Sequence, residues 1–151
     1  MFILGFILVL VFFVFLANIF NGDIRHFLDF WSMGMVLLPL LAVLITTNSL
    51  KAFCGGLMAV VLNKKTIPKK LQEQSIALFR LLTKATAIIS VIGFLIQLII
   101  TLRVVDIYDP AVYPKIAPNI AMFLVVVLYG LFLIVAVFEP AVYCLKRYDA
   151  D

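Results

Sequence analysis

Four polar residues and one glycine lie on one side of an otherwise apolar stretch, residues 85–102. They are Thr86, Ser90, Gly93, Gln97 and Thr101, called here the polar stripe. At about 100° per residue, the five positions share an arc of roughly 80° on a helix. An unpartnered polar group is costly in lipid, so the stripe is expected to face protein, or water inside an assembly. It indicates either close helix packing through small and hydroxyl residues or a wetted wall that lines a pore or grips a polar partner helix.

Two residues near the end of the last apolar stretch add further candidate chemistry. Glu139 is the only acidic residue expected inside an apolar stretch, and it lies roughly 10 Å along a helix from Lys146. Such a glutamate either bonds to water or a cation at the membrane surface, or accepts protons at the inner exit of a channel. Pro140 frees the carbonyl four residues earlier, so we expect a kink there. Pro39 predicts a second kink, and both kinks are equally compatible with plain packing.

No further residues form a pattern typical of catalysis. The chain has no glycine-rich nucleotide loop, no zinc-ligand spacing and no nucleophile motif, and its single histidine, His26, falls in a short expected loop. We therefore expect no enzyme, no metal site and no cofactor. Because only Glu139 is expected within a span, any proton transfer through the membrane requires a carboxylate from another chain.

The elements that position these residues are expected to be membrane helices. The chain has 151 residues, of which 66% are hydrophobic and 13% charged, and its mean hydropathy is +1.22. These values are typical of a polytopic membrane protein and exclude a soluble domain. A membrane helix needs about 20 mostly apolar residues. We therefore expect an all-α membrane protein, a single domain of residues 1–151, with four spans at about 2–20, 31–49, 85–102 and 118–144.

The distribution of charge predicts the orientation of these spans. Basic residues in membrane proteins concentrate on the cytoplasmic side. The short segment 51–84 holds seven of them against the single acidic Glu73: Lys51, Lys64, Lys65, Lys69, Lys70, Arg80 and Lys84. Lys146 and Arg147 add to the C-terminal end, and the other connections are balanced. Both termini and segment 51–84 are thus expected in the cytoplasm, where the lysine pairs either face lipid headgroups or only set orientation. The net charge of +4 therefore says little about nucleic acid, and no nucleic-acid partner is expected.

The second half of segment 51–84 has the pattern of a helix. No proline or glycine interrupts the chain between Lys69 and Gly93, so a helix is expected to start in the cytoplasm and run unbroken into the third span. Leu78, Leu81 and Leu82 are expected on its apolar face. The polar residues expected away from that face are Gln72, Glu73 and Arg80.

In their order along the chain, several short motifs resemble the MotA/TolQ/ExbB proton channel family, specifically a short MotA-like protein. The FLDFWS run, residues 27–32, is similar to the family's entry into its second helix. Residues 93–102 resemble its glycine-containing third helix, followed by an outer turn with Asp109-Pro110. An Ala…Leu-Tyr-Gly…Pro pattern typical of its fourth helix is matched by Ala121, Leu128-Tyr129-Gly130 and Pro140.

The resemblance implies an assembly. In such a family the chain forms a homopentamer in the bacterial inner membrane, around the single helices of a MotB-like or ExbD-like partner that carries the proton-binding Asp. The third and fourth helices line the central pore in that family. The resemblance therefore implies that Val126, Val127 and Gly130 line the pore together with the polar stripe, and that Glu139 and Pro140 lie at its inner exit.

The chain also departs from the family pattern. Val126-Val127 stand where a threonine pair is usual, which makes the expected ion path drier. The 34 residues of segment 51–84 are too few for the charged cytoplasmic domain of a flagellar stator. Two alternatives therefore stay open, namely a non-conducting scaffold of the same architecture and a small four-helix solute transporter. Such transporters usually place an acidic residue in the middle of the membrane.

Overall fold

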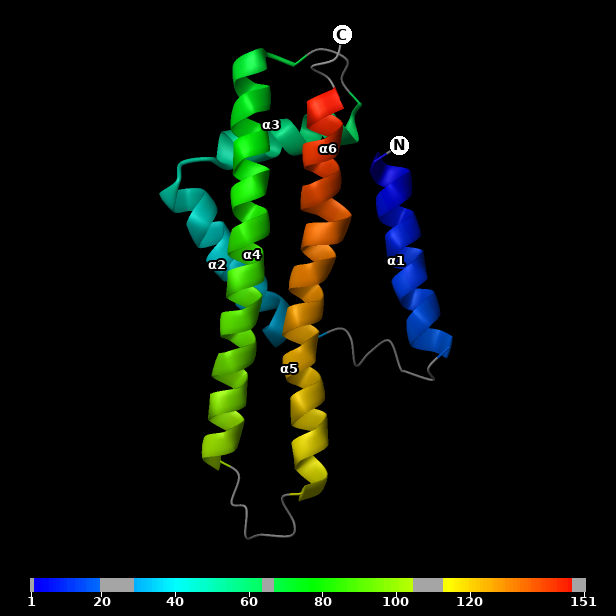
Figure 1. Cartoon of the computed structure of the whole chain (residues 1–151), viewed down its shortest axis with the longest axis vertical. Helices are drawn as coiled ribbons and strands as arrows, with labels where there is room; N and C mark the ends of the chain where they lie inside the picture. Colours follow the sequence, from blue (N-terminus) through cyan, green and yellow to red (C-terminus); the bar gives the residue numbers. More distant parts are fainter. Residues whose placement is uncertain (1, 20–28, 64–66, 105–112, 148–151) are drawn as a thin grey trace.

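The computed structural model describes residues 2–19, 29–63, 67–104 and 113–147, and all regular structure in these ranges is helical (Figure 1). Of these residues, the side chains of 16–19, 104 and 113–119 are not described. The elements are α1 (Phe2–Ile19), α2 (Phe30–Thr46), α3 (Leu50–Val61), α4 (Lys69–Val104), α5 (Tyr113–Leu133), the π-helix η2 (Ile134–Phe138) and α6 (Glu139–Arg147). His26, Lys64, Lys65 and the expected turn at Asp109-Pro110 lie outside the described residues.

Two long helical runs are apolar enough to cross a membrane. They are Lys69–Arg103, within α4, and Ile120–Arg147, which combines most of α5 with η2 and α6. The α2–α3 pair qualifies as a third span only if its 113° bend is counted within one span, and the apolar part Phe2–Phe15 of α1 is shorter. Length and composition thus give two spans, or three, against the four that the sequence predicts.

Helix α4 confirms the prediction of one unbroken helix from Lys69 into the third apolar stretch, since it runs for 36 residues. Leu78 and Leu82 are buried, as their spacing predicts, whereas Leu81, expected on the same face, is 43% exposed. The expectation that Gln72 lies away from the apolar face is wrong. Its side chain is buried and its Nε2 donates a hydrogen bond of 2.7 Å to the carbonyl of Leu145, so the polar amide joins α4 to α6.

Helix α3 was not expected from the sequence. Thr47 caps the end of α2, and Asn48 turns the chain with a φ of 49°. This positive φ is one that asparagine tolerates better than most residues. The new helix crosses the axis of α4 (Figure 1) and packs closely on it, because Gly56 presents no side chain to Ser75. Ser75 Oγ donates to the carbonyl of Ala52 at 2.9 Å and fastens the contact.

The hydrophobic core lies at the end of the molecule that carries α3. Phe79 of α4 is fully buried, and its ring lies 5.7 Å from that of Phe53 in α3 and 6.2 Å from that of Phe138 in η2. Val36 and Leu40 of α2 belong to the same cluster. Loss of an aromatic side chain from such a site typically costs about 3 to 5 kcal/mol, so this end holds the helices together.

Just before Pro140, where the sequence predicts a kink, the structure has a π-helical turn. Pro140 has no N–H to donate, and the residue before it, Glu139, donates its N–H to the carbonyl of Ile134, five residues back. Helix α6 then continues the course of α5 (Figure 1). At Pro39, by contrast, α2 stays α-helical on both sides of the proline.

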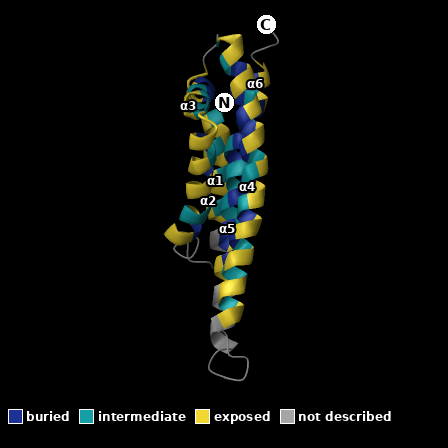
Figure 2. Ribbon diagram, turned by 90° about the vertical axis from the view of Figure 1, so that its left-hand side faces the viewer, coloured by how far each residue is buried: buried dark blue, intermediate teal, exposed yellow. Residues whose placement is uncertain are grey.

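The opposite end of the molecule is a bare helical hairpin. In Figure 1, α4 and α5 continue well past α1 and α2, and Figure 2 shows mostly exposed residues on this part of α4. Large apolar side chains are exposed there, among them Ile99 at 63% and Leu102 at 65%. This surface requires a lipid or protein environment.

Candidate functional site

The first three residues of the polar stripe face α5 of the same chain. Thr86, Ser90 and Gly93 are all buried. A Cβ at Gly130 would collide with Ser90 Oγ and lie 2.9 Å from Ser90 Cβ, and a Cβ at Gly93 would lie 3.0 Å from Val126. The two backbones therefore approach closely, as the close-packing interpretation predicts.

The last two residues of the polar stripe are only half-buried. Gln97 and Thr101 lie where α4 extends toward the bare end of the hairpin. Gln97 Nε2 lies 3.3 Å from the sulfur of Met35 in α2, a weak acceptor. Its Oε1 is buried and has no hydrogen-bond partner among the described residues.

The hydroxyls of the stripe are unequally satisfied. Ser90 Oγ donates to the carbonyl of Thr86 at 2.8 Å. Thr86 Oγ1 is buried without a partner in the part of the chain that the structure describes. A buried polar atom without a partner is uncommon in native structures. Thr86 Oγ1 and Gln97 Oε1 are therefore the two buried atoms of the polar stripe that lack a hydrogen-bond partner among the described residues.

The candidate residues of α5 differ in how far they are buried against α4. Val126 is fully buried against α4, and Gly130 is buried beside Ser90. Val127 is half-buried. The structure thus brings Val126 and Gly130 together with the stripe inside one chain. That any of these residues lines a pore in an assembly stays a prediction.

Glu139 and Pro140 lie apart from this contact, at the start of α6. Glu139 is exposed and Pro140 half-buried. Thr83 Oγ1 lies 3.3 Å from Glu139 Oε1, which links α6 to α4 one residue before the basic Lys84. An exposed carboxylate with one hydroxyl partner is compatible with both interpretations of Glu139, a group at the membrane surface and a group at the inner exit of a channel.

Asp29 lies just before the expected second span, within the run 27–32. It caps α2, where its side chain accepts hydrogen bonds from the N–H groups of Trp31 and Ser32 and from Ser32 Oγ, the last at 2.5 Å.

The position of Asp29 in the fold is unexpected. Its N–H donates to the hydroxyl of Tyr129 at 3.0 Å. Tyr129 lies within the apolar run Ile120–Arg147. The N-terminal end of α2 therefore lies beside a residue of an apolar span. The resemblance of residues 27–32 to a helix entry was the available signal, because Asp followed three residues later by Ser suits a helix start.

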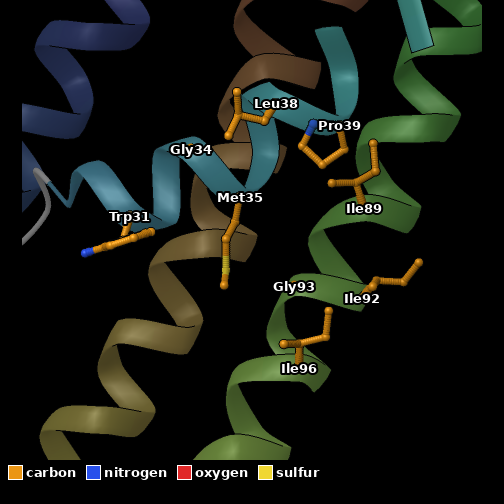
Figure 3. Close-up of a pocket in the computed structure, with 9 residues that line it drawn as sticks. All are labelled: Trp31, Gly34, Met35, Leu38, Pro39, Ile89, Ile92, Gly93 and Ile96. Atoms are coloured by element: carbon orange, nitrogen blue, oxygen red, sulfur yellow. The ribbon is translucent and has the colours of Figure 1, made fainter. Parts of the chain in front are cut away.

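An apolar recess of about 440 Å³ opens between α2 and α4 on the side of Gly93 away from α5 (Figure 3). Trp31 and Met35 line it from α2, and Ile92 and Ile96 line it from α4. Figure 3 shows Trp31 pointing away from α4, whereas Met35 points along it toward the bare end of the hairpin. The apolar lining of this recess suits acyl chains or an apolar helix, and it presents no side chain typical of catalysis. Among the described residues, no three histidine, cysteine or acidic side chains are grouped to hold a metal.

The fold and the site define an all-helical membrane protein with a closely packed α4–α5 pair. Comparison of the chain with protein-family models, curated protein sequences and solved structures finds no match. The similarity to the MotA/TolQ/ExbB family accordingly stays a prediction from the motifs.

Proposed function

We propose that this chain is a MotA-like subunit of an ion-driven motor or channel complex in the bacterial inner membrane. It crosses the membrane four times with both termini in the cytoplasm, and α2 with α1 flank the α4–α5 pair. Five copies form a ring around the helices of a single-span partner that carries a proton-binding Asp. The chain itself has no catalytic activity.

The bare α4–α5 hairpin is the observation that carries this proposal. Within one chain, α1 and α2 leave its outer part uncovered (Figure 1). The exposed side chains there are aliphatic, with Leu95 at 46% and Ile99 at 63%. The half-buried Gln97, which has a free oxygen, lies on the neighbouring face. Apolar faces beside a polar strip are what a helix needs to contact both lipid and further protein.

A non-conducting scaffold of the same ring architecture is the second candidate. The burial of Thr86, Ser90 and Gly93 against α5 favours it, because side chains spent on packing within one chain leave fewer polar groups for an ion path. A four-helix solute transporter is a third possibility, and the position of Asp29 is the feature that it would use.

The oligomeric state tests the architecture that both ring candidates share. We expect native mass spectrometry of the full chain, released from mild detergent, to show five copies. The matched variants are Ile99→Asn, on the exposed outer part of α4, and Lys146→Asn, which is exposed on α6 away from the hairpin. The first should reduce the pentamer and the second should leave it intact. A monomer or an antiparallel dimer of the unaltered chain would overturn the ring and favour a transporter.

A further inference from the structure

Helix α3 has an apolar outer surface that is unsuited to water. Of its 12 residues, only Lys51 is charged. Large aliphatic side chains are exposed along the helix and at its C-cap: Leu50, Met58, Val61 and Leu62. An exposed apolar surface of this kind marks contact with a membrane or with another protein. The charge pattern predicts this segment in the cytoplasm, and its apolar surface indicates a more specific place.

The exposed aliphatic residues of α4 mark the thickness of a bilayer. They begin at Leu81 and end at Leu102, and exposed arginines flank them directly, Arg80 before and Arg103 after. From Leu81 to Leu102 the helix rises roughly 31 Å, and the hydrocarbon core of a bilayer is about 30 Å thick. Lys84 lies less than one turn inside this belt, near enough for its side chain to reach the headgroups. Leu81 therefore marks the hydrocarbon boundary at the end of the molecule that carries α3.

Helix α2 gives the same boundary, and α3 lies just beyond it. The exposed aliphatic side chains of α2 continue to Ile45, and the turn that follows lines a recess together with Leu81. Gly56 of α3 packs over Ser75 and Phe79 of α4, so the axis of α3 lies roughly 6 Å beyond Leu81. The headgroup layer on each side of a bilayer is about 5 to 8 Å thick. Helix α3 is therefore at the depth of the headgroups, and Figure 1 shows that it lies across α4.

The side of α3 that faces the hydrocarbon follows from its contact with α4. A Cβ at Gly55 would lie 3.3 Å from the side chain of Leu71, which is farther from the hydrocarbon boundary than the residues under Gly56. The Gly55 side of α3 therefore points toward water. At about 100° per residue, Leu50 and Val61 lie roughly 120° to 140° from Gly55 and within about 20° of each other. These two exposed side chains thus point toward the hydrocarbon.

A phospholipid surface is the cover that the surroundings of α3 favour. The exposed aliphatic face of α2 ends at Ile45, five residues before Leu50, so the two apolar surfaces adjoin. Lys51 lies in the first turn of α3, and Lys64 and Lys65 follow the helix in the sequence. Basic residues next to a membrane are attracted to its anionic lipids.

We propose that α3 is a surface helix, which lies in the plane of the membrane within the headgroup layer of the adjoining leaflet. Leu50 and Val61 rest on the acyl chains. Lys51 and Leu62, which lie within about 40° of Gly55, face the water. Surface helices of this kind bury their apolar side about 5 to 10 Å into the boundary between headgroups and acyl chains. The proposal requires only that α4 crosses the membrane, and it does not depend on ion conduction or on ring assembly.

Quenching of a small bimane label tests the depth of α3 in liposomes of phosphatidylglycerol and phosphatidylcholine. Single cysteines are placed in the full chain, whose own cysteines are replaced by serine. Lipids brominated on their acyl chains should quench Leu50→Cys more than its neighbour Lys51→Cys, and Val61→Cys more than its neighbour Leu62→Cys. Iodide on both sides of the membrane should quench in the reverse order. Neighbours differ in depth by about the helix radius of 5 Å, and because each pair shares one position along the axis, a tilt of α3 cannot produce this pattern.

Two positions on α4 calibrate the quenchers. Leu95→Cys is exposed within the hydrocarbon belt and should respond to brominated lipid, whereas Lys70→Cys is exposed well outside it and should respond to iodide. All six positions are exposed, so the labelled chains should keep the melting temperature of the unaltered chain, and either pair on α3 decides the question if one variant fails to fold.

Three results would overturn the proposal. Quenching of all four α3 labels by iodide, with no effect of brominated lipid, would place α3 in water. Equal quenching of all four by brominated lipid would make α3 part of a bent span inside the hydrocarbon. Protection of all four from both quenchers would show that protein covers α3, either a second copy of the chain or another partner.

Discussion

Gln97 is the residue whose local environment most limits what the polar stripe can do. A buried amide is stable when its oxygen and both hydrogens find partners, but here the nitrogen meets only a thioether and the oxygen meets nothing among the described residues. In hydrocarbon this arrangement is costly. A partner helix or a file of water beside Gln97 would satisfy it.

At the scale of this residue we predict a selective loss of ion flux. Liposomes that hold only this chain should be proton-tight, because on α5 Val126 is fully buried and the half-buried Val127 offers no polar group, and a narrow apolar passage dewets. Addition of a synthetic single-span helix with one central Asp should open the path. Gln97→Leu should then lower the flux about five- to thirtyfold, the factor that corresponds to 1 to 2 kcal/mol. A pH-sensitive dye inside the liposomes measures it.

The controls for this experiment come from two other positions. Leu95→Ala changes an exposed side chain on another face of α4 and should lower the flux less than Gln97→Leu. Asp29→Asn retains the capping oxygen but removes the charge beside Tyr129. Steady conduction by this chain alone, abolished by Asp29→Asn and unaffected by Gln97→Leu, would transfer the proton-binding role to Asp29 and refute the assignment of the stripe.

At the scale of elements, the α4–α5 contact depends on the missing side chain of Gly130. Gly130→Ala should destabilise the fold by about 1 to 3 kcal/mol, because overpacking forces tightly packed helices apart. In the double variant with Ser90→Gly most of this loss should be recovered, since both atoms that the new Cβ meets most closely belong to Ser90. Gly5→Ala is the control, because nothing lies within 4 Å of a Cβ there. Thermal unfolding in detergent measures the series, and a loss at Gly130 that Ser90→Gly does not relieve would mean that the two helices pack differently.

The elements differ in how far the sequence predicts them. Helix α4 was predictable because its 36 residues contain no proline and only one glycine, so nothing in the sequence indicates a helix break. The period of its polar residues identifies the face that turns inward. Which helix packs on that face depends on tertiary structure, and no local sequence pattern predicts that it is α5. Helix α3 was missed because residues 51–84 were interpreted from their basic residues as a cytoplasmic segment, with a helix expected only in the second half of that segment. Only the polar triplet Thr47-Asn48-Ser49 marks the 113° bend between α2 and α3.

At the scale of the whole molecule, the two ends of the α4–α5 pair differ in charge. The start of α1, the end of α6 and the whole of α3 lie at one end of the pair (Figure 1). The basic residues of α3, of the first half of α4 and of α6 gather there, whereas Arg103 lies in the last turn of α4, at the other end. The other end is the bare apolar hairpin. An asymmetric distribution of positive charge sets the orientation of a membrane protein, so the end with α3 is expected in the cytoplasm.

Thiol labelling tests this orientation, because both cysteines lie at the end with α3. Cys54 is exposed on α3 and Cys144 is half-buried on α6. A membrane-impermeant maleimide should leave both unmodified in sealed spheroplasts and should label Cys54 before Cys144 once the membrane is opened. Arg103→Cys, in a chain whose own cysteines are replaced by serine, places an exposed thiol at the bare end and should react in sealed spheroplasts. Labelling of Cys54 in sealed spheroplasts, with Arg103→Cys protected, would require the reverse orientation, and the basic residues would then have no role in setting it.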